Sequence, residues 1–522
     1  KASPRTGRLA VVAVVVLLGV GLGAAALVYL QRPVDPLVGA GSSPDPSSAP
    51  RSSTDPTSRP THRVGLAPQP PVGTPRPIDR PATASLPVRG SGRDLGTRIQ
   101  LAPGAAGDLF VSVPAPGARI LVTLVDAVGR SRPGWPIVLD RTTSCDELLP
   151  VEDGSVRLLC TPDNRDGSMT GVVRAHAFDA SGNALPGWPI DLDRYGADGS
   201  FAERVIGDEL TFLAWKSLGA QIEAGKPAGH AWIVAIAADG TVAAGSKVSY
   251  GIDCCIDTWA IGPDGVAYGT VHHFADTRAG AMSELVAIGP TGVPDGFPIT
   301  IVGSASQPAF DAAGLIHLTV GTPNERPSGT LVFDGAGRTT AAGSGELDVA
   351  ATSEFLGIEG TGSFPVAPLV GRDGVTYLID LSGGATTVAG LDPSGRAMTG
   401  WPYRSDLGPQ RTRSCRAGDG CEGSAWAAPA AGPDNVLYLV QAATSSSVGG
   451  SIVAVGQDGV VVDGWPVGLR RAGSEAWSVV VGPDGNASVL AVEPEPNGSH
   501  SATILSLAPD SSVRYTLTVV EP

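Results

Sequence analysis

The stretch FDASGNALPGWPIDL (178–192) contains the pattern that decides the fold. An apolar strand end leads into Asp-x-x-Gly, a tight-turn signal, and a second short strand carries Gly-Trp-Pro. The frame recurs as VDAVGRSRPGWPIVL (125–139), LDPSGRAMTGWPYRS (391–405), VGQDGVVVDGWPVGL (455–469) and, with Phe for Trp, IGPTGVPDGFPITI (288–301). Degenerate copies are IAADGTVAAGSKVSY (236–250), FDGAGRTTAAGSGEL (333–347) and LAPDSSVRYTLTV (507–519), which makes eight.

A second series of eight hairpins alternates with the first. The clear copies are WAIGPDGVAYGTV (259–271), PAFDAAGLIHLTV (308–320), PLVGRDGVTYLID (368–380), PAAGPDNVLYLVQ (429–441) and SVVVGPDGNASVL (478–490). The weaker ones are QLAPGAAGDLFVSV (100–113), VEDGSVRLLC (151–160) and RVIGDELTFLAW (204–215). Short turns between alternating apolar residues predict hairpins.

Two hairpins per repeat give four strands per repeat and predict an all-β fold, an eight-bladed β-propeller over residues 97–522. The spacing from Gly129 to Gly459 averages 55 residues over six intervals, which suits a four-stranded blade with one long loop. Seven blades and an open solenoid are the alternatives, but a closed ring hides the terminal edges that a solenoid must cap.

Gly-Trp-Pro has a structural interpretation. Gly permits a turn, Pro blocks further pairing at the strand end, and a flat aromatic ring fits between neighbouring blades. We therefore expect the aromatic residues of this element to pack between blades: Trp135, Trp188, Phe297, Trp401 and Trp465.

The N-terminal region has a different composition from the repeats. Residues 9–30 form an uncharged apolar run, preceded by Lys1, Arg5 and Arg8, and predict a membrane-spanning helix with residues 1–8 in the cytoplasm. A cleaved signal peptide is the alternative. Residues 31–96 are rich in Pro, Ser and Thr and predict a disordered stalk that holds the propeller outside a bacterial cell membrane. Because the first residue is Lys1, an upstream signalling domain stays open.

The net charge of −15 argues against a nucleic-acid partner. Six cysteines lie downstream of the export segment: Cys145, Cys160, Cys254, Cys255, Cys415 and Cys421. An exported chain with an even count favours disulfides. The local pairings are Cys145–Cys160 and Cys415–Cys421, which would leave Cys254 and Cys255 to form a strained bond between neighbours.

The frame Asp-x-x-Gly followed by Trp resembles the tryptophan-docking repeat of PQQ-like, quinoprotein-type bacterial propellers, over roughly residues 97–519. The resemblance implies a fold shared by proteins with unrelated functions. A vicinal disulfide, a bond between neighbouring cysteines, is also a feature of quinoprotein alcohol dehydrogenases. If this chain were such an enzyme, the resemblance would imply PQQ and calcium as its cofactors. Here Ile256 separates the cysteines from Asp257 and no Asn-Arg-Gly follows, so we predict no cofactor, no metal ligand and no catalytic residue.

The interval between Gly395 and Gly459 is the longest between turn glycines and contains GPQRTRSCRAGDGCEGSAW. Arg411, Arg413 and Arg416 make it a candidate binding loop, with a solvated surface loop as the alternative. His272 and His273 are adjacent in a predicted strand, so they would point to opposite faces and do not suggest a metal site.

Together these features favour a monomeric recognition module, a sensor or scaffold that binds a protein or a small envelope ligand. A quinoprotein-like enzyme and an envelope-assembly scaffold are the alternatives. We lean against an enzyme because the sequence contains no Gly-x-Ser-x-Gly element, zinc spacing or phosphate loop.

Overall fold

The computed structural model describes part of the chain. The described residues are 75–77, 84–87 and 99–520, the last range without 116–118, 141, 163–172, 193–199, 218–228, 243–247, 253–255, 274–281, 322–326, 341–344, 347–367, 372, 381–385, 408–410, 414–423, 427–428, 443–448, 470, 472 and 497–499. They belong to a compact unit, Pro68–Pro522. The predicted cytoplasmic stub, the predicted membrane helix and most of the predicted stalk lie outside them. In the described part, no helix is long and apolar enough to span a membrane.

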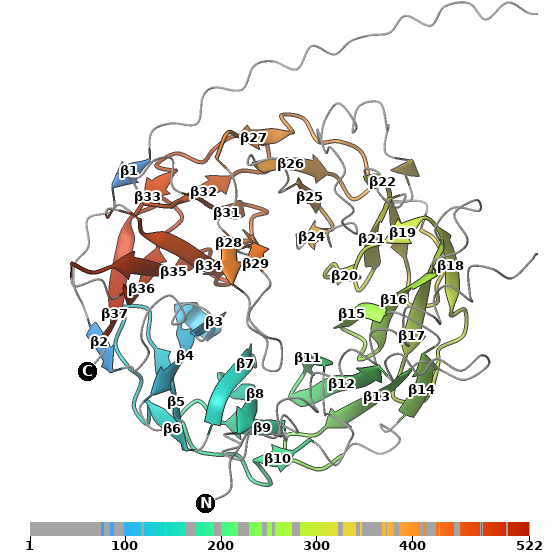
Figure 1. Cartoon of the computed structure of the whole chain (residues 1–522), viewed down its shortest axis with the longest axis horizontal. Coiled ribbons are helices and arrows are strands. Elements are labelled where there is room, and N and C mark those ends of the chain that lie inside the picture. The colour runs from blue at the N-terminus through green and yellow to red at the C-terminus, as the bar shows by residue number, and fades with distance from the viewer. Residues whose placement is uncertain are drawn as a thin grey trace, which may run out of the picture. The chain divides into compact units, whose positions relative to one another are not determined.

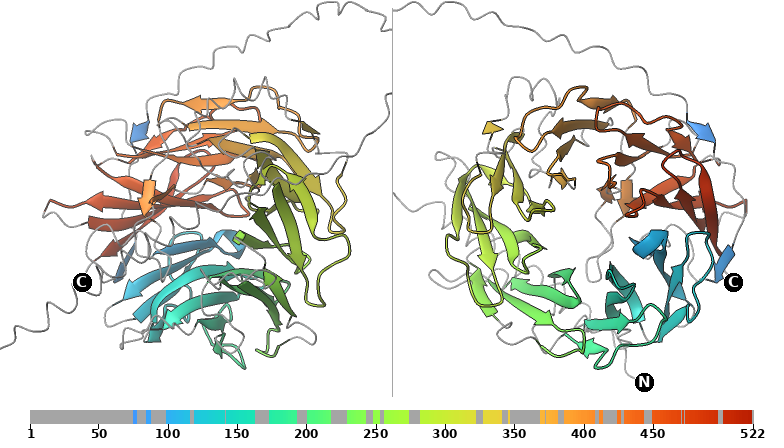
Figure 2. Two further views of the ribbon diagram at one scale, coloured as in Figure 1. Left: turned by 45° about the vertical axis from the view of Figure 1, so that its right-hand side comes forward. Right: turned by 180° about the vertical axis from the view of Figure 1, so that it is seen from behind.

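Eight sheets form a ring in chain order, and each has the four antiparallel strands of a propeller blade (Figure 1). The ring is closed, because apolar side chains of the first sheet, including Val111, share one core with Trp477 and Leu517 of the last. Figure 2 shows the same ring turned by 45° and from behind. The eight-bladed prediction is confirmed, and the seven-bladed and solenoid alternatives are wrong.

The first four blades follow the chain without insertions in their sheets. Blade 1 has β3 (Gln100–Pro103), β4 (Leu109–Ala115), β5 (Arg119–Val125) and β6 (Ile137–Asp140), with a short 3₁₀ turn, η2 (Ala105–Gly107). Blade 2 has β7 (Thr142–Pro150), β8 (Val156–Pro162), β9 (Arg174–Phe178) and β10 (Ile190–Asp191). Blade 3 has β11 (Ser200–Ile206), β12 (Glu209–Ser217), β13 (Gly229–Ile236) and β14 (Val248–Ile252). Blade 4 has β15 (Ile256–Ile261), β16 (Ala267–His273), β17 (Met282–Ile288) and β18 (Ile299–Val302).

The last four blades contain two additions. In blade 5, β19 (Ser304–Ala305) and β20 (Ala309–Phe310) both pair with β21 (Ile316–Gly321), followed by β22 (Pro327–Phe333) and β23 (Gly345–Glu346). Blade 6 has β24 (Leu369–Val370), β25 (Thr376–Asp380), β26 (Thr386–Leu391) and β27 (Tyr403–Ser405). A separate hairpin, β28 (Arg411–Arg413) and β29 (Ser424–Trp426), precedes blade 7, which has β30 (Ala430–Ala431), β31 (Leu437–Gln441), β32 (Ser451–Val455) and β33 (Val467–Gly468). Blade 8 has β34 (Glu475–Val481), β35 (Ala487–Pro494), β36 (His500–Leu507) and β37 (Val513–Val520).

Each blade has two different ends. One end carries the turn between the first and second strands and the turn between the third and fourth, and we call it the turn end. The opposite end carries the connection between the second and third strands and the passage to the next blade, and we call it the loop end.

The sequence explains the turns directly. In blade 1, Asp126 Oδ1 accepts hydrogen bonds from the backbone N–H groups of Val128 (3.0 Å) and Arg130 (2.9 Å). Gly129 has φ +82°, a left-handed conformation that favours glycine. The Asp-x-x-Gly pattern thus predicts this turn from local chemistry alone.

Two short strands add an N-terminal strap to the ring. β1 (Arg76–Pro77) pairs in parallel with β33, and β2 (Ala84–Pro87) pairs in parallel with β37. The strap therefore covers the outer edges of blades 7 and 8. The sequence places these residues in the disordered stalk of 31–96, because edge pairing uses main-chain groups and leaves no apolar pattern to detect.

Candidate functional site

The tryptophans of Gly-Trp-Pro dock four of the blades onto the blade that follows, at the turn end. Each indole Nε1–H donates to a backbone carbonyl in the turn between the third and fourth strands of the following blade. The pairs are Trp135 to Ala180 (3.1 Å), Trp188 to Ala238 (2.9 Å), Trp401 to Gln457 (2.8 Å) and Trp465 to Pro509 (3.0 Å). All four indoles are buried. We call this set of contacts the outer belt.

Phe297 takes the same place in blade 4 without an indole N–H. Its ring is half-buried and lies edge-on to Tyr268, with the ring centroids 5.7 Å apart. The preceding Gly296 still comes close to blade 5, since a Cβ on it would lie 2.4 Å from the carbonyl oxygen of Ala336. Blade 4 therefore keeps the close approach of this glycine to the next blade, although it has phenylalanine in place of tryptophan.

The proline of this element has a different position from the one expected. Each of the five follows a cis peptide bond and stands immediately before the outer strand of its blade, as Pro136 does before Ile137 and Pro466 before Val467. The proline therefore precedes a strand and does not end one. A first strand position suits proline, which has no N–H to contribute to the ladder.

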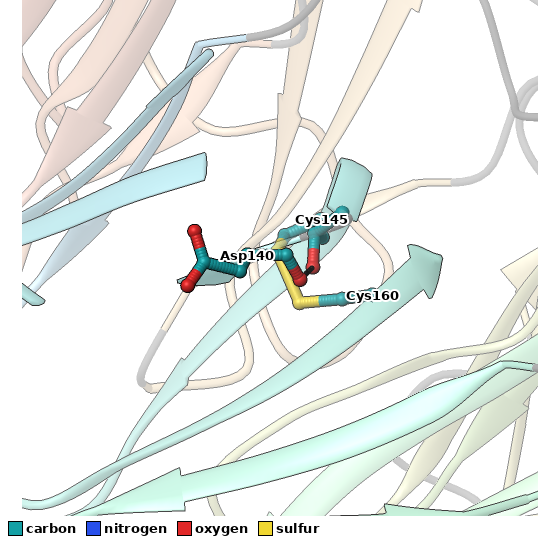
Figure 3. The surroundings of a disulfide bond; sticks show 4 residues. Asp140, Cys145 and Cys160 are labelled. Carbon is teal, nitrogen blue, oxygen red and sulfur yellow. Dashed lines mark hydrogen bonds between the residues drawn. A yellow bond between two sulfur atoms is a disulfide. The ribbon is translucent and has the colours of Figure 1, made fainter. Parts of the chain in front are cut away.

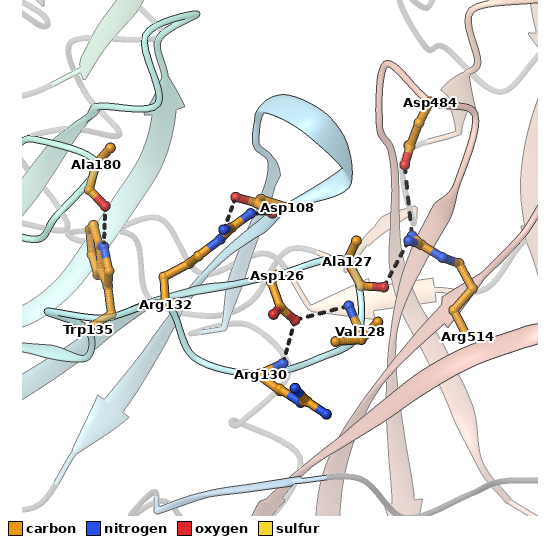
Figure 4. A network of polar contacts seen from close by, with 10 residues as sticks. All are labelled: Asp108, Asp126, Ala127, Val128, Arg130, Arg132, Trp135, Ala180, Asp484 and Arg514. Atoms are coloured by element: carbon orange, nitrogen blue, oxygen red, sulfur yellow. Dashed lines mark hydrogen bonds and ion pairs between the residues drawn. The ribbon is translucent and has the colours of Figure 1, made fainter.

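An arginine closes the ring where the outer belt would need a tryptophan in blade 8. Arg514 in β37 donates from Nη2 to the carbonyl oxygen of Ala127 in blade 1 (2.8 Å). Ala127 occupies the same turn position in blade 1 as Ala180 does in blade 2 (Figure 4). Asp484 lies 3.9 Å from the guanidinium of Arg514. The sequence did not suggest Arg514, because the last repeat carries no Gly-Trp-Pro.

A second, inner belt joins the turns between the first and second strands. Tyr377 in blade 6 donates to the carbonyl oxygen of Asn435 in blade 7 (2.6 Å), and Tyr438 in blade 7 donates to that of Gly485 in blade 8 (3.3 Å). Arg157 in blade 2 does the same toward Asp208 in blade 3 (3.1 Å). Burial raises the pKa of Tyr377 and the pKa of Tyr438 to about 12, so both phenols stay protonated donors.

Blade 5 fills the inner-belt position with a histidine. His317 Nε2 lies 3.2 Å from Asp311 Oδ2, and His317 Nδ1 lies 3.3 Å from Thr376 Oγ1 of blade 6. His317 and Thr376 are buried. The arrangement orders an Asp, a His and a Thr in a line, but the hydroxyl is enclosed at a blade junction. We therefore interpret it as the contact between blades 5 and 6, where no tryptophan docks.

The loop end is most elaborated around blade 6. Residues 347–368 separate blade 5 from blade 6, and residues 406–429 separate blade 6 from blade 7. The other blade-to-blade passages are shorter, for example 192–199 before blade 3 and 253–255 before blade 4. The second long passage contains β28 and β29, which Figures 1 and 2 draw on the inner side of the ring.

The predicted binding-loop residues fall partly on this hairpin. Arg411 and Arg413 belong to β28, where the register pairs them with Trp426 and Ser424 of β29. Arg416 lies outside the described residues. The candidate site is thus the loop end of blade 6 with the passage that follows it, and two of the three predicted arginines share one strand of that passage.

The predicted cysteine pairs have different outcomes. Cys145 and Cys160 form a disulfide between β7 and β8, and both residues are buried at the loop end of blade 2 (Figure 3). That pairing is confirmed. Cys254, Cys255, Cys415 and Cys421 lie outside the described residues, so their pairings stay predictions.

The quinone alternative depends on the same undescribed residues. Among the residues that the structure describes, no three His, Cys, Asp or Glu side chains are grouped so that they could hold a metal ion. The quinone alternative, with its calcium, stays a prediction about Cys254 and Cys255.

Comparison with known proteins adds only distant likenesses. No family model matches the chain, and no curated protein matches its sequence. Similar solved structures include a quinoprotein alcohol dehydrogenase-like protein from Bacteroides thetaiotaomicron, at 11% identity over 84% of this chain and 94% of that one, with a TM-score of 0.35. A eukaryotic initiation factor is 12% identical over 85% of this chain and 90% of that one, with a TM-score of 0.40. A lectin from Burkholderia pseudomallei is 11% identical over 81% of this chain and 99% of that one, with a TM-score of 0.32. At these scores the likenesses carry no argument about function, and the fold assignment depends on the sheet topology.

Proposed function

We propose that the protein is a recognition module, a membrane-anchored propeller on the extracytoplasmic side that acts as a sensor or scaffold. Its binding surface is the loop end of blade 6, and its partner is a protein or a small envelope ligand. A protein partner would make it an envelope-assembly scaffold, which is a special case of the same proposal.

One observation carries the proposal. The two longest passages between blades, 347–368 and 406–429, lie on either side of blade 6. At the turn end, by contrast, short turns are held by the outer and inner belts. Binding residues are concentrated on loops that a rigid scaffold positions, so the elaborated sector is the best candidate for recognition.

The chemistry of β28 adds a preference for the partner. Arg411 and Arg413 are two cations in a chain with a net charge of −15. Guanidinium groups bind carboxylates and phosphates with paired hydrogen bonds. We therefore expect the partner to present acidic groups to this hairpin.

The test compares two pairs of arginines. Arg411→Ala with Arg413→Ala alters the hairpin, and Arg338→Ala with Arg396→Ala alters exposed arginines of turn-end turns in blades 5 and 6. Both proteins would be cross-linked in intact membranes, and the captured partners quantified by mass spectrometry. We expect the hairpin variant to lose captured partner at least 5-fold and the turn-end variant to match the wild type. Equal capture by both variants would contradict the proposed surface.

A further inference from the structure

The junction between blades 6 and 7 differs from the other junctions at its loop end. Tyr403 stands two positions after Trp401, in the outer strand of blade 6. The corresponding residues of the other Gly-Trp-Pro or Gly-Phe-Pro copies are apolar: Ile137, Ile190, Ile299 and Val467. Gln441, the last residue of β31, stands where four other second strands have the apolar residues Val113, Cys160, Val271 and Val320 and where blade 6 has Asp380. A sequence comparison among the repeats would have shown that Tyr403 is an exception and that Gln441 is one of two polar residues at its position.

Five polar side chains form this cluster, and all are buried. They are Thr386, Tyr403, Ser405, Gln441 and Ser451, with exposed fractions between 0% and 5%. Gln441 Nε2 lies 3.5 Å from Tyr403 Oη across the junction. None of the five side chains is charged at neutral pH, since burial raises the pKa of Tyr403 further above its usual range.

The cluster is also the base of the 406–429 passage. Leu407 N donates to Ser405 Oγ (3.1 Å), and Thr386 Oγ1 donates to the carbonyl oxygen of Leu407 (2.9 Å). These partly buried hydrogen bonds hold Leu407, the last described residue before β28. The cluster therefore lies next to the start of the proposed binding surface.

Two buried polar atoms of the cluster have no hydrogen-bond partner in the protein. They are Gln441 Oε1 and Ser451 Oγ. Exchanging the two amide atoms of Gln441 would leave the nitrogen without a partner instead, so one amide atom is unpartnered under either assignment. Gln441 and Ser451 are register partners in β31 and β32, so they lie side by side on one face. Buried polar groups are normally satisfied, so these two neighbouring atoms leave hydrogen-bonding capacity that the protein itself does not use.

We propose that Gln441 and Ser451 form a subsite for an uncharged hydrogen-bonding group of a ligand, a hydroxyl of the kind that sugars and polyols carry. A hydroxyl both donates and accepts, so a single one satisfies the amide of Gln441 and the hydroxyl of Ser451 together. An anion or a cation would be buried here without a countercharge among the five side chains. The inference depends on the proposed function, because it names a ligand group for the same sector.

The test titrates glycerol, glucose and N-acetylglucosamine against the full chain, with acetate as a charged comparison, by saturation-transfer NMR. We expect at least one neutral probe to bind and acetate not to bind. In Gln441→Leu with Ser451→Ala, binding of that probe should weaken at least 10-fold. Ser112→Ala is the matched control, because Ser112 Oγ is also buried without a partner but lies in blade 1, so binding should be unchanged.

Folding is checked by the thermal midpoint of each variant. The double variant removes the two unpartnered oxygens but also the long Gln441–Tyr403 hydrogen bond, so its midpoint should lie close to or above that of the wild type. If no neutral probe binds and the double variant is more stable, the cluster holds an ordered water only and the proposal is overturned. Probe binding that is equal in the wild type and the double variant would also overturn it.

The two proposals can fail separately. If the arginine variant loses partner capture but no probe binds in a Gln441-dependent way, the subsite proposal fails and the proposed recognition surface stands. Gln441-dependent binding together with unchanged capture would remove the hairpin surface and leave the subsite.

Discussion

The turn end and the loop end of the blades are built by opposite rules. At the turn end, a tryptophan and a glycine of one blade meet backbone atoms of the next, as Trp135 meets Ala180. At the loop end, the connections between second and third strands vary from 116–118 in blade 1 to 218–228 in blade 3. One ring can therefore keep short turns docked on the next blade at one end while the other end varies in length.

The acceptors of the outer belt explain why the turn end tolerates sequence change. The four indoles donate to the carbonyl oxygens of Ala180, Ala238, Gln457 and Pro509, so alanine, glutamine and proline all serve as acceptors. Only the main chain of the acceptor matters. The donor blade is less tolerant, because its glycine must lie against that same main chain.

The largest expected effect is therefore at a docking glycine. Gly134 has φ +86°, and a Cβ there would lie 1.8 Å from the backbone oxygen of Ser181. We expect Gly134→Ala to lower the free energy of unfolding by about 4 kcal/mol, because both strain and a backbone clash result. Gly207→Ala is the control, since Gly207 has φ +61° but no atom within 4 Å, and it should cost about 1 kcal/mol. Chemical denaturation would measure both, and equal losses would show that the close approach does not matter.

Removing the Cys145–Cys160 disulfide tests how much this covalent bond at the loop end adds to the stability of blade 2. Cys145 and Cys160 are separated by 15 residues, a loop for which a disulfide contributes about 3 kcal/mol. Replacing both cysteines with alanine should lower the thermal midpoint, and the wild type in reductant should fall to the value of the variant. A variant as stable as the oxidised wild type would mean that the turn-end belts alone hold blade 2.

His176 lies between the two ends, in β9 of blade 2. Burial is the main reason that its pKa is lowered to about 4, with Arg174 adding to the effect and Asp191 opposing it. The unfolded chain takes up a proton near pH 6.5, but the folded protein does not until about pH 4. Stability is therefore complete above pH 6.5 and falls as the pH drops toward 4, by up to about 3 kcal/mol.

His176→Phe keeps a planar ring beside Phe178, on which His176 is stacked with centroids 6.2 Å apart. The variant should lose this pH dependence while the remaining acid sensitivity of the protein stays. Thermal midpoints measured from pH 7 to pH 4.5 would show the difference. Parallel curves for wild type and variant would rule out His176 as the group responsible.

The smallest effect isolates a single docking hydrogen bond. Trp465→Phe removes the donor to Pro509 and should cost about 1 kcal/mol beyond the loss of ring size. Trp259→Phe is the matched control, because Trp259 is also buried but its Nε1 has no hydrogen-bond partner. Denaturation midpoints that shift equally in the two variants would mean that the indole acts only by packing.

Several parts of the structure could be predicted because their signals are local. Asp126 and Gly129 determine a turn through hydrogen bonds and a backbone angle within five residues. Repetition of such turns predicted the strands and the blade count. The pairing of Cys145 with Cys160 followed from their closeness along the chain.

Other parts could not be predicted because their partners are distant in sequence. Arg514 and Ala127 are 387 residues apart and meet only when the ring closes. Arg76 contacts Ser511 across 435 residues, through a strap whose pairing uses main-chain groups. The polar cluster at Gln441 needs two blades side by side before its burial becomes visible.

The sequence by itself determined the all-β repeat, its eight copies and the aromatic residues that join them, because turn chemistry and strand alternation act over a few residues. Tertiary structure alone decided how the ring closes, which strands the N-terminal segment extends, and where polar groups become buried without partners. Those features arise from contacts between blades. The free energy of such contacts depends on the burial of side chains, which occurs only when neighbouring repeats pack together.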